Sequence, residues 1–254
     1  MIKIENAEVM GWEHAIRGMR NPLESWNRMD SYKPNCLCCP RDGVEPYEEH
    51  DVTVLPYVLG KNDHDLMMRL AKAWGEHAKY RRMIVVYADV TAPLYWWKEY
   101  DTYKVGAVAN SCSTMHKIAD KEFTLKDFSY EHLDDEFECV KSSAADPYDG
   151  DFKTSIGILL DTIEGLNWWR NQYLHQKEIN AGTERLRWCW WQLIQLLPSS
   201  YNQRRTIMLN YEVLANIYRQ RLNHKLDEWR EFCKWIEQLP YSELITGKEA
   251  EANG

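Results

Sequence analysis

Apolar residues recur every three to four positions in several stretches, which is the spacing of a helix with one buried face. These stretches predict helices at 63–79, 154–175, 185–197, 209–218 and 226–236. Pro93 is suited to open a further helix through residues 94–101. Residues 83–90 are β-branched and apolar, and they predict a strand buried on both faces. We therefore expect an α/β (α+β) fold that is predominantly helical with a small central sheet.

No repeat, low-complexity tract or Gly/Ser linker divides the 254 residues, so one domain spanning 1–254 is expected. Residues 30–56 hold four of the nine prolines and an Asp-Gly pair, which predicts an irregular surface excursion. Residues 120–148 are acidic and weakly periodic and predict two short helices at most. The polar residues at 245–254 predict a frayed tail.

The composition is that of an ordinary globular protein, with 44% hydrophobic and 28% charged residues. The longest apolar runs fall well short of the roughly 18–20 residues that a bilayer-spanning helix needs, so no membrane span is expected. The first residues lack a basic region followed by a long apolar run, which predicts a cytoplasmic protein without a signal peptide. Seven cysteines in such a chain favour reduced thiols over a disulfide framework.

The net charge of the chain limits the classes of ligand that we expect it to bind. A net charge of −8 opposes nonspecific attraction to nucleic acid, so nucleic acid is not an expected partner. A small phosphorylated ligand needs only two or three positioned arginines, and nucleotides therefore stay candidates.

Cys36, Cys38 and Cys39 form the densest thiol cluster, for which a soft metal ion and reduced loop thiols are the alternatives. Structural zinc sites use matched pairs of ligands, and only His50 stands nearby, so reduced thiols are favoured and no metal site is predicted. A metal-dependent enzyme built on this loop has the least support. The fingerprints of P-loop, Rossmann, zincin and serine-hydrolase proteins are absent from the sequence.

Three further patterns each allow two interpretations. Adjacent tryptophans could stack on planar ligands or pack in the core and at subunit contacts, and packing is favoured; they stand at 96–97, 168–169, 188 and 190–191. Late arginines could bind an anion or pair with acidic neighbours, and pairing is favoured; they are Arg204, Arg205, Arg219, Arg221 and Arg230. The short polar side chains of 106–116 could let a ligand approach the backbone or form a helix-packing seam.

The C-terminal third resembles the flavin-dependent thymidylate synthases, which use FAD, NADPH and methylene-tetrahydrofolate to methylate dUMP. The residues that carry the resemblance follow the family's order at closely similar spacing; they are Leu197-Pro198, Asn210, Leu214, Asn216, Arg221, His224 and Glu228-Trp229-Arg230. The similarity covers roughly residues 63–118 and 190–238.

The family's signature is Arg-His-Arg, seven residues and a serine. Counting back from Ser113 places residues 103–105, Tyr-Lys-Val, at the triad that holds and polarises the flavin in that family. Asn110 and Ser113 match the signature, whereas Ser111 stands in place of its Glu. Met115, followed by His116, stands where the family has an arginine that takes the nucleotide phosphate.

The resemblance implies a role for each retained residue. Ser113, His116 and Arg221 would bind the nucleotide, and Arg221 would contact its phosphate. The FAD side of the site would be formed by Asn110, Asn210, Asn216 and His224. The family's sites lie between subunits of a homotetramer, which would make the Trp-rich helices an interface.

The leading hypothesis is a diverged relative that binds a pyrimidine nucleotide and FAD and transfers a one-carbon group to the pyrimidine. The alternative is a noncatalytic binding or assembly protein that keeps the fold without the cofactor and fills its pocket with its own aromatics, such as Trp96 or Tyr103. The segments 91–98 and 197–202 also resemble phage and prophage proteins, a resemblance that implies no function.

Overall fold

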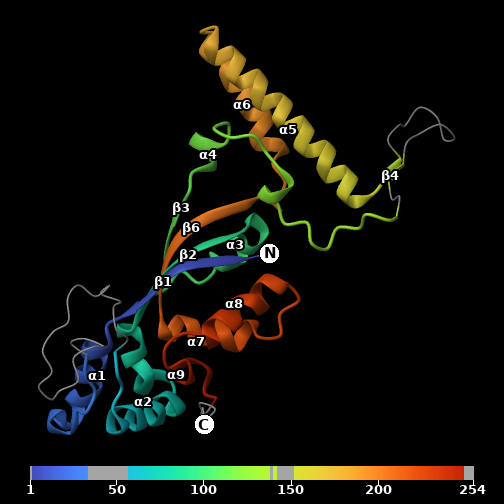
Figure 1. Cartoon of the computed structure of the whole chain (residues 1–254). Coiled ribbons are helices and arrows are strands. Elements are labelled where there is room, and N and C mark those ends of the chain that lie inside the picture. Colours follow the sequence, from blue (N-terminus) through green and yellow to red (C-terminus); the bar gives the residue numbers. More distant parts are fainter. Residues whose placement is uncertain (1, 34–56, 138–139, 142–151, 249–254) are drawn as a thin grey trace, which may run out of the picture. The chain divides into compact units, whose positions relative to one another are not determined.

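The computed structural model describes residues 2–33, 57–137, 140–141 and 152–248 (Figure 1). The chain divides into two compact units, each assembled from separate stretches of sequence. Unit 1 comprises Met1–Lys3, Val90–Thr102 and Asn110–Arg205. Unit 2 comprises Ile4–Asp89, Tyr103–Ala109 and Thr206–Gly254.

A four-stranded sheet has the order β1-β2-β6-β3. Its strands are β1 (Lys3–Met10), β2 (Val85–Pro93), β3 (Val108–Ser111) and β6 (Asn202–Asn210). A second, antiparallel pair joins β4 (Val140–Lys141) to β5 (Phe152–Lys153). The predicted fold class, mostly helical with a small sheet, is confirmed.

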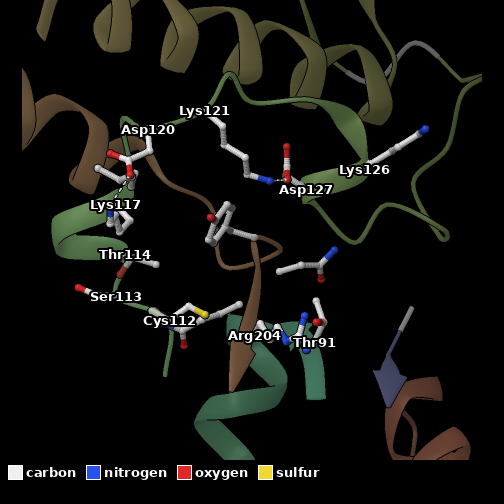
Figure 2. A pocket seen from close by; sticks show the side chains of 14 residues that line it. Thr91, Cys112, Ser113, Thr114, Lys117, Asp120, Lys121, Lys126, Asp127 and Arg204 are labelled. Carbon is white, nitrogen blue, oxygen red and sulfur yellow. Dashed lines mark hydrogen bonds and ion pairs between the residues drawn. The ribbon is translucent and has the colours of Figure 1, made fainter. Parts of the chain in front are cut away.

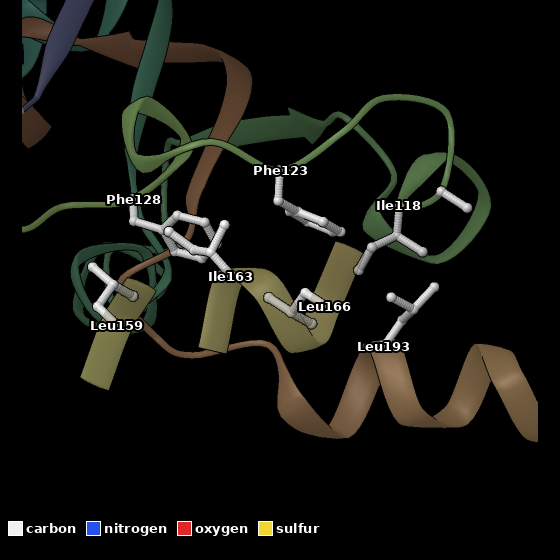
Figure 3. Packing of buried hydrophobic residues seen from close by; sticks show 8 residues of the cluster. Ile118, Phe123, Phe128, Leu159, Ile163, Leu166 and Leu193 are labelled. Carbon is white, nitrogen blue, oxygen red and sulfur yellow. The ribbon is translucent and has the colours of Figure 1, made fainter. Parts of the chain in front are cut away.

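Unit 1 is dominated by a helical hairpin of α5 (Ser155–Glu178) and α6 (Thr183–Leu196), which lie side by side (Figure 1). Its shorter elements are α3 (Leu94–Tyr100), α4 (Thr114–Lys117) and the 3-10 turn η4 (Leu125–Asp127). The hairpin packs against the segment before and after η4 through one apolar cluster, which includes Ile118, Phe123, Phe128, Leu159, Ile163, Leu166 and Leu193 (Figure 3).

Asn167 of α5 fixes this segment through the backbone of Phe123. Its side-chain oxygen accepts the Phe123 N–H at 2.8 Å, and its amide donates to the Phe123 carbonyl at 2.9 Å. The two hydrogen bonds hold the start of the 123–128 segment against the helix.

Unit 2 contains the remaining elements that the structure describes. They are α1 (Trp12–Arg20), η1 (Asn21–Leu23), η2 (Trp26–Arg28), α2 (Lys61–Ala73), η3 (Gly75–Met83), α7 (Tyr211–Arg221), α8 (Asp227–Glu237) and α9 (Glu243–Thr246). Trp229 and Phe232 of α8 are fully buried and pack edge to face with ring centroids 5.9 Å apart. The periodic apolar residues of the last helices thus form a core, as predicted.

The predicted helices at 94–101, 154–175, 185–197 and 226–236 are confirmed as α3, α5, α6 and α8. The predicted helix at 63–79 is only partly right, because α2 ends at Ala73. Trp74 and Gly75 follow with φ of +59° and +57°, a conformation that interrupts the helix, and the chain continues as the 3-10 helix η3.

One strand prediction and one helix prediction are corrected. Strand β2 alternates between more buried and more exposed positions, and Tyr87 is 40% exposed, so it is not buried on both faces. The helix predicted from residue 209 begins at Tyr211, because Leu209 and Asn210 end strand β6. Sequence periodicity missed β6, which alternates only weakly, as well as β1, β3 and α1.

Most of the predicted excursion at 30–56 lies outside the described residues, including Cys36, Cys38, Cys39 and His50. The predicted tail at 245–254 starts too early, because Ile245 is 4% exposed within α9, and residues 249–254 lie outside the described part. One domain spanning the chain stays a prediction. None of the described helices combines the length and apolarity required to cross a membrane.

A buried ion pair organises the N-terminal part of unit 2. Arg20 and Asp63 have side chains that are 4% and 0% exposed, with 2.6 Å between the guanidinium and carboxylate atoms. The other carboxylate oxygen of Asp63 accepts the backbone N–H groups of Asp30 and Ser31, both at 2.9 Å, and the Ser31 hydroxyl at 2.7 Å. Asp63 thus joins α1, α2 and the 30–31 segment.

Replacing Asp63 by Asn leaves the Arg20 charge buried without a counter-charge, so we expect Asp63→Asn to lower the free energy of unfolding by about 3–5 kcal/mol at pH 7. Burial raises the pKa of Asp63, but hydrogen bonds from Ser31, Asp30 and Arg20 outweigh it and hold the pKa below the ordinary 3.8. The difference between wild type and variant should therefore be full above pH 3.8 and shrink as the pH falls through the lower folded pKa.

Urea unfolding at pH 7 and at a series of values below pH 4 measures this difference. Asp65→Asn, an exposed carboxylate on the same helix, is the matched control. An equal loss of stability in both variants would contradict the assigned role of Asp63.

Candidate functional site

A pocket of about 450 Å³ lies within unit 1 (Figure 2). Strands β2 and β6, residues 112–113 after β3, the short helix α4 and the segment through η4 supply its lining. The lining residues are Thr91, Cys112, Ser113, Thr114, Lys117, Ile118, Asp120, Lys121, Lys126, Asp127, Tyr201, Asn202, Gln203 and Arg204. This volume is in the range of sites for small ligands, roughly 300–1,000 Å³.

The lining carries more positive than negative charge. Four cationic side chains, three lysines and Arg204, face two aspartates, an excess of two positive charges. Lys117 pairs with Asp120 at 2.7 Å, and Lys121 pairs with Asp127 (Figure 2). Since the chain as a whole is acidic, this local excess favours an anionic ligand.

Asp127 is held as a charged acceptor. Burial raises its pKa, but hydrogen bonds from Lys121 and Thr124 outweigh that effect, and the pKa is lowered. The pKa of the Tyr201 hydroxyl is raised above the ordinary 10.0 by burial, so this group is a protonated donor at neutral pH, as an exposed tyrosine also is. Tyr201 packs edge to face on Phe128, with ring centroids 5.7 Å apart, so the apolar cluster holds its ring in place.

Ser113 lies at the pocket wall as the N-cap of α4, where its hydroxyl oxygen accepts the His116 N–H at 3.2 Å. The preceding residue, Cys112, has an exposed, free thiol. Its backbone is fixed to strand β6, because its N–H donates to the Arg204 carbonyl at 2.9 Å and its carbonyl accepts from the Gln203 side chain at 3.0 Å.

Arg221, predicted to contact a phosphate, lies in unit 2 within a cluster of aromatic and polar side chains. Its Nε donates to the Tyr103 hydroxyl at 2.9 Å, and its Nη1 lies 2.9 Å from His224 Nε2. The guanidinium carbon lies 4.8 Å from the ring centroid of Trp229. Tyr103 in turn donates to Gln220 at 3.0 Å.

Asn210 has a structural role in unit 2. Its side-chain oxygen accepts the Val213 N–H at 3.0 Å and caps α7, while its amide donates to the Gly106 carbonyl at 3.4 Å. A side chain at Gly106, whose φ is +78°, would come within 2.8 Å of that amide. Asn216 is half-buried on α7, and Asn110 is exposed on β3 and is not part of the pocket lining.

Four of the predicted site residues thus fall into two local groups. Ser113 and His116 are bonded to each other in unit 1, whereas Arg221 and His224 contact each other in unit 2. Sequence reasoning missed the lysines and Tyr201 of the pocket. The recurrence of lysines at 117, 121 and 126, around the start of the weakly periodic segment, was the signal that could have indicated them.

The alternative interpretations of other residues are resolved in part. Trp96 and Trp97 are fully buried, and their rings stack on or meet Tyr100, so they belong to the core. Arg205 pairs with Asp101 and Arg230 pairs with Asp227, as favoured for the late arginines. Within the described ranges no cluster of three or more His, Cys, Asp or Glu side chains could hold a metal ion.

Comparison with known proteins identifies the fold. No family model and no curated protein sequence matches the chain. A crystal structure of thymidylate synthase X (ThyX) from Helicobacter pylori with FAD and dUMP matches 97% of this chain and 98% of its own, with a TM-score of 0.56 and 14% identity. A second structure, of flavin-dependent ThyX from the same organism complexed with FAD and dUMP, matches 96% and 98%, with a TM-score of 0.54 and 14% identity. The chain therefore has a fold like that of the flavin-dependent thymidylate synthases.

Proposed function

We propose that this protein binds a pyrimidine nucleotide in the pocket of unit 1. The excess of two positive charges around that pocket carries the proposal, because a phosphate monoester bears up to two negative charges at neutral pH. The solved proteins of similar fold were crystallised with dUMP, which supports a pyrimidine as the base.

In this proposal the phosphate interacts with Arg204 and the lysines, while the hydroxyl groups of Ser113 and Tyr201 are donors to the rest of the nucleotide. Tyr201 can donate because its hydroxyl stays protonated. Arg221, which is bonded to Tyr103, lies in the other unit and is not needed for this site.

The affinity for dUMP measured by titration calorimetry tests the proposal. Wild type should bind dUMP and should bind 2′-deoxyuridine, which lacks only the phosphate, at least about tenfold more weakly. Arg204→Gln should weaken dUMP binding about tenfold, whereas Arg187→Gln, an exposed arginine on α6 outside the pocket, should leave it unchanged.

Cys112 gives an independent readout, because its exposed thiol lines the pocket. Bound dUMP should slow the alkylation of Cys112 by iodoacetamide. Mass spectrometry of the peptide that contains Cys112 measures the rate. An unchanged alkylation rate at saturating dUMP, or equal affinity for 2′-deoxyuridine and dUMP, is the result that rejects this site.

FAD is the cofactor that the fold implies, and it would supply electrons for one-carbon transfer. The described residues do not fit the way in which the family holds the flavin. At the triad positions, Tyr103 is bonded to Arg221 and Gln220, and Val105 is 90% exposed. Both side-chain groups of Asn210 are occupied by the protein itself. We therefore derive no transfer step through FAD.

The contact between Tyr103 and Arg221 favours a second candidate function, a nucleotide-binding protein that keeps the fold without the flavin. Titration of FAD into the purified protein should then leave the visible spectrum of the flavin unperturbed and the melting temperature unchanged. A perturbed spectrum that is lost on Asn216→Ala would instead support the cofactor site implied by the resemblance.

We also propose that the protein forms a homo-oligomer, a tetramer by resemblance, through the α5–α6 hairpin. Trp168, Trp188 and Trp191 on these helices are 53%, 44% and 40% exposed, an unusual amount of aromatic surface for one hairpin. A second copy of the chain would cover this surface. Location in the cytoplasm and a relationship to phage proteins stay predictions.

Light scattering after size exclusion should give the mass of four chains. Trp168→Lys should shift the protein to smaller assemblies, whereas Trp26→Lys, a similarly exposed tryptophan in unit 2, should not. A wild-type monomer at micromolar concentration contradicts this proposal.

A further inference from the structure

Arg81 is a buried cation that forms no ion pair with the described residues. It lies on η3 and is only 2% exposed. Its Nε atom has no hydrogen-bond acceptor, and no carboxylate of the described residues forms an ion pair with it. The guanidinium carbon lies 5.5 Å from the ring centroid of Trp74, and the Tyr80 hydroxyl is its polar neighbour.

Glu212 is the carboxylate that influences Arg81, but it already pairs with another arginine. The carboxylate of Glu212 accepts a hydrogen bond from Arg82 Nε at 2.5 Å. Burial lowers the pKa of Arg81, and the influence of Tyr80 and Glu212 offsets this only in part. An arginine still stays protonated at neutral pH, so the protein keeps a desolvated charge that is costly unless an anion binds it.

A second guanidinium lies beside the same ring. The Cζ atom of Arg219, on α7, is 4.7 Å from the ring centroid of Trp74, and Arg219 is exposed and has no ion pair within the described residues. Two positively charged groups therefore lie within 5.5 Å of one ring centroid, and an anion that binds both would offset their mutual repulsion.

The backbone at Trp74 is held in a conformation that favours glycine. Its φ is +59° and its ψ is −179°, a combination that costs of order 1–3 kcal/mol for a residue with a side chain. The strained backbone places the half-exposed indole next to both arginines. Such strain is concentrated at functional sites, which is consistent with a ligand here.

We propose that Arg81 and Arg219 form an oxyanion site beside Trp74 and that its ligand carries a phosphate group. Two guanidinium groups match the two charges of a phosphate better than the single charge of a carboxylate. All three residues belong to unit 2, so this site does not depend on the nucleotide pocket proposed in unit 1.

Thermal unfolding in a buffer of low ionic strength, with inorganic phosphate as the probe and sodium acetate at equal ionic strength as the reference, tests the site. Phosphate should raise the melting temperature of wild type by about 3 °C or more. Arg81→Met and Arg219→Gln should each lose most of this rise. Lys234→Gln, which removes an exposed charge that is paired with Glu231 in the same unit, should retain it. Arg204→Gln should also retain it, which separates this site from the nucleotide pocket.

Unfolding without phosphate provides a second readout. Arg81→Met should melt at or above the temperature of wild type, because an apolar side chain replaces an unpaired buried charge. A clear fall would show that the protein itself pairs the guanidinium and would overturn the proposal. A phosphate-induced rise that is equal in wild type and in Arg219→Gln, a surface variant that should not perturb folding, would overturn it as well.

Discussion

A charged side chain that leaves water must find an opposite charge or a full set of hydrogen bonds, and unit 2 shows both outcomes of this requirement. Asp63 is fully buried, and it is satisfied by Arg20 and by three further donors from residues 30 and 31. These contacts offset the cost of burying the Asp63 carboxylate, and they connect α1, α2 and the 30–31 segment. Arg81 is also buried, but its Nε atom has no hydrogen-bond acceptor and no described carboxylate forms an ion pair with it, which is why we propose that it binds a ligand.

The same requirement explains why the fold matches that of the solved proteins while the residues at the implied flavin site already have partners within the protein. The match to the solved thymidylate synthases extends over nearly the whole chain. By the resemblance Tyr103 would stand at a position of the flavin-binding triad, but its hydroxyl accepts a hydrogen bond from Arg221. The side-chain oxygen of Asn210 caps α7, and its amide donates to the Gly106 carbonyl. The surplus of positive charge that can attract a nucleotide lies in unit 1, around Arg204 and the lysines of the 117–126 segment. We therefore propose nucleotide binding in unit 1 without a role for the flavin.

The spacing of apolar residues was sufficient to predict the long helices. The helices around Leu166 and Leu193 are long and rich in apolar residues at helical spacing, so their existence and approximate bounds could be predicted. It was insufficient where local backbone conformation decides, as at Trp74, whose positive φ ends α2 before the apolar rhythm stops. Strand β6 was missed because its apolar residues continue directly into α7, and only the capping role of Asn210 marks the boundary.

The candidate site shows the same limits. Ser113 was found because it matches a family motif, and the structure places it at the wall of the pocket. The lysines of the pocket and Tyr201 match no motif, and they come together only through the packing of the 118–128 segment on the helical hairpin. Contacts between residues so distant in sequence are set by tertiary structure, which periodicity does not contain.

The most direct test of the central claim is a crystal structure of the protein soaked with 5-bromo-dUMP, in which anomalous scattering locates the bromine. Binding in the unit 1 pocket predicts a bromine peak within that pocket, and phosphate density within hydrogen-bonding distance of the Arg204 guanidinium or a pocket lysine. A peak only beside Arg221 in unit 2, or no peak at saturating nucleotide, would contradict the account.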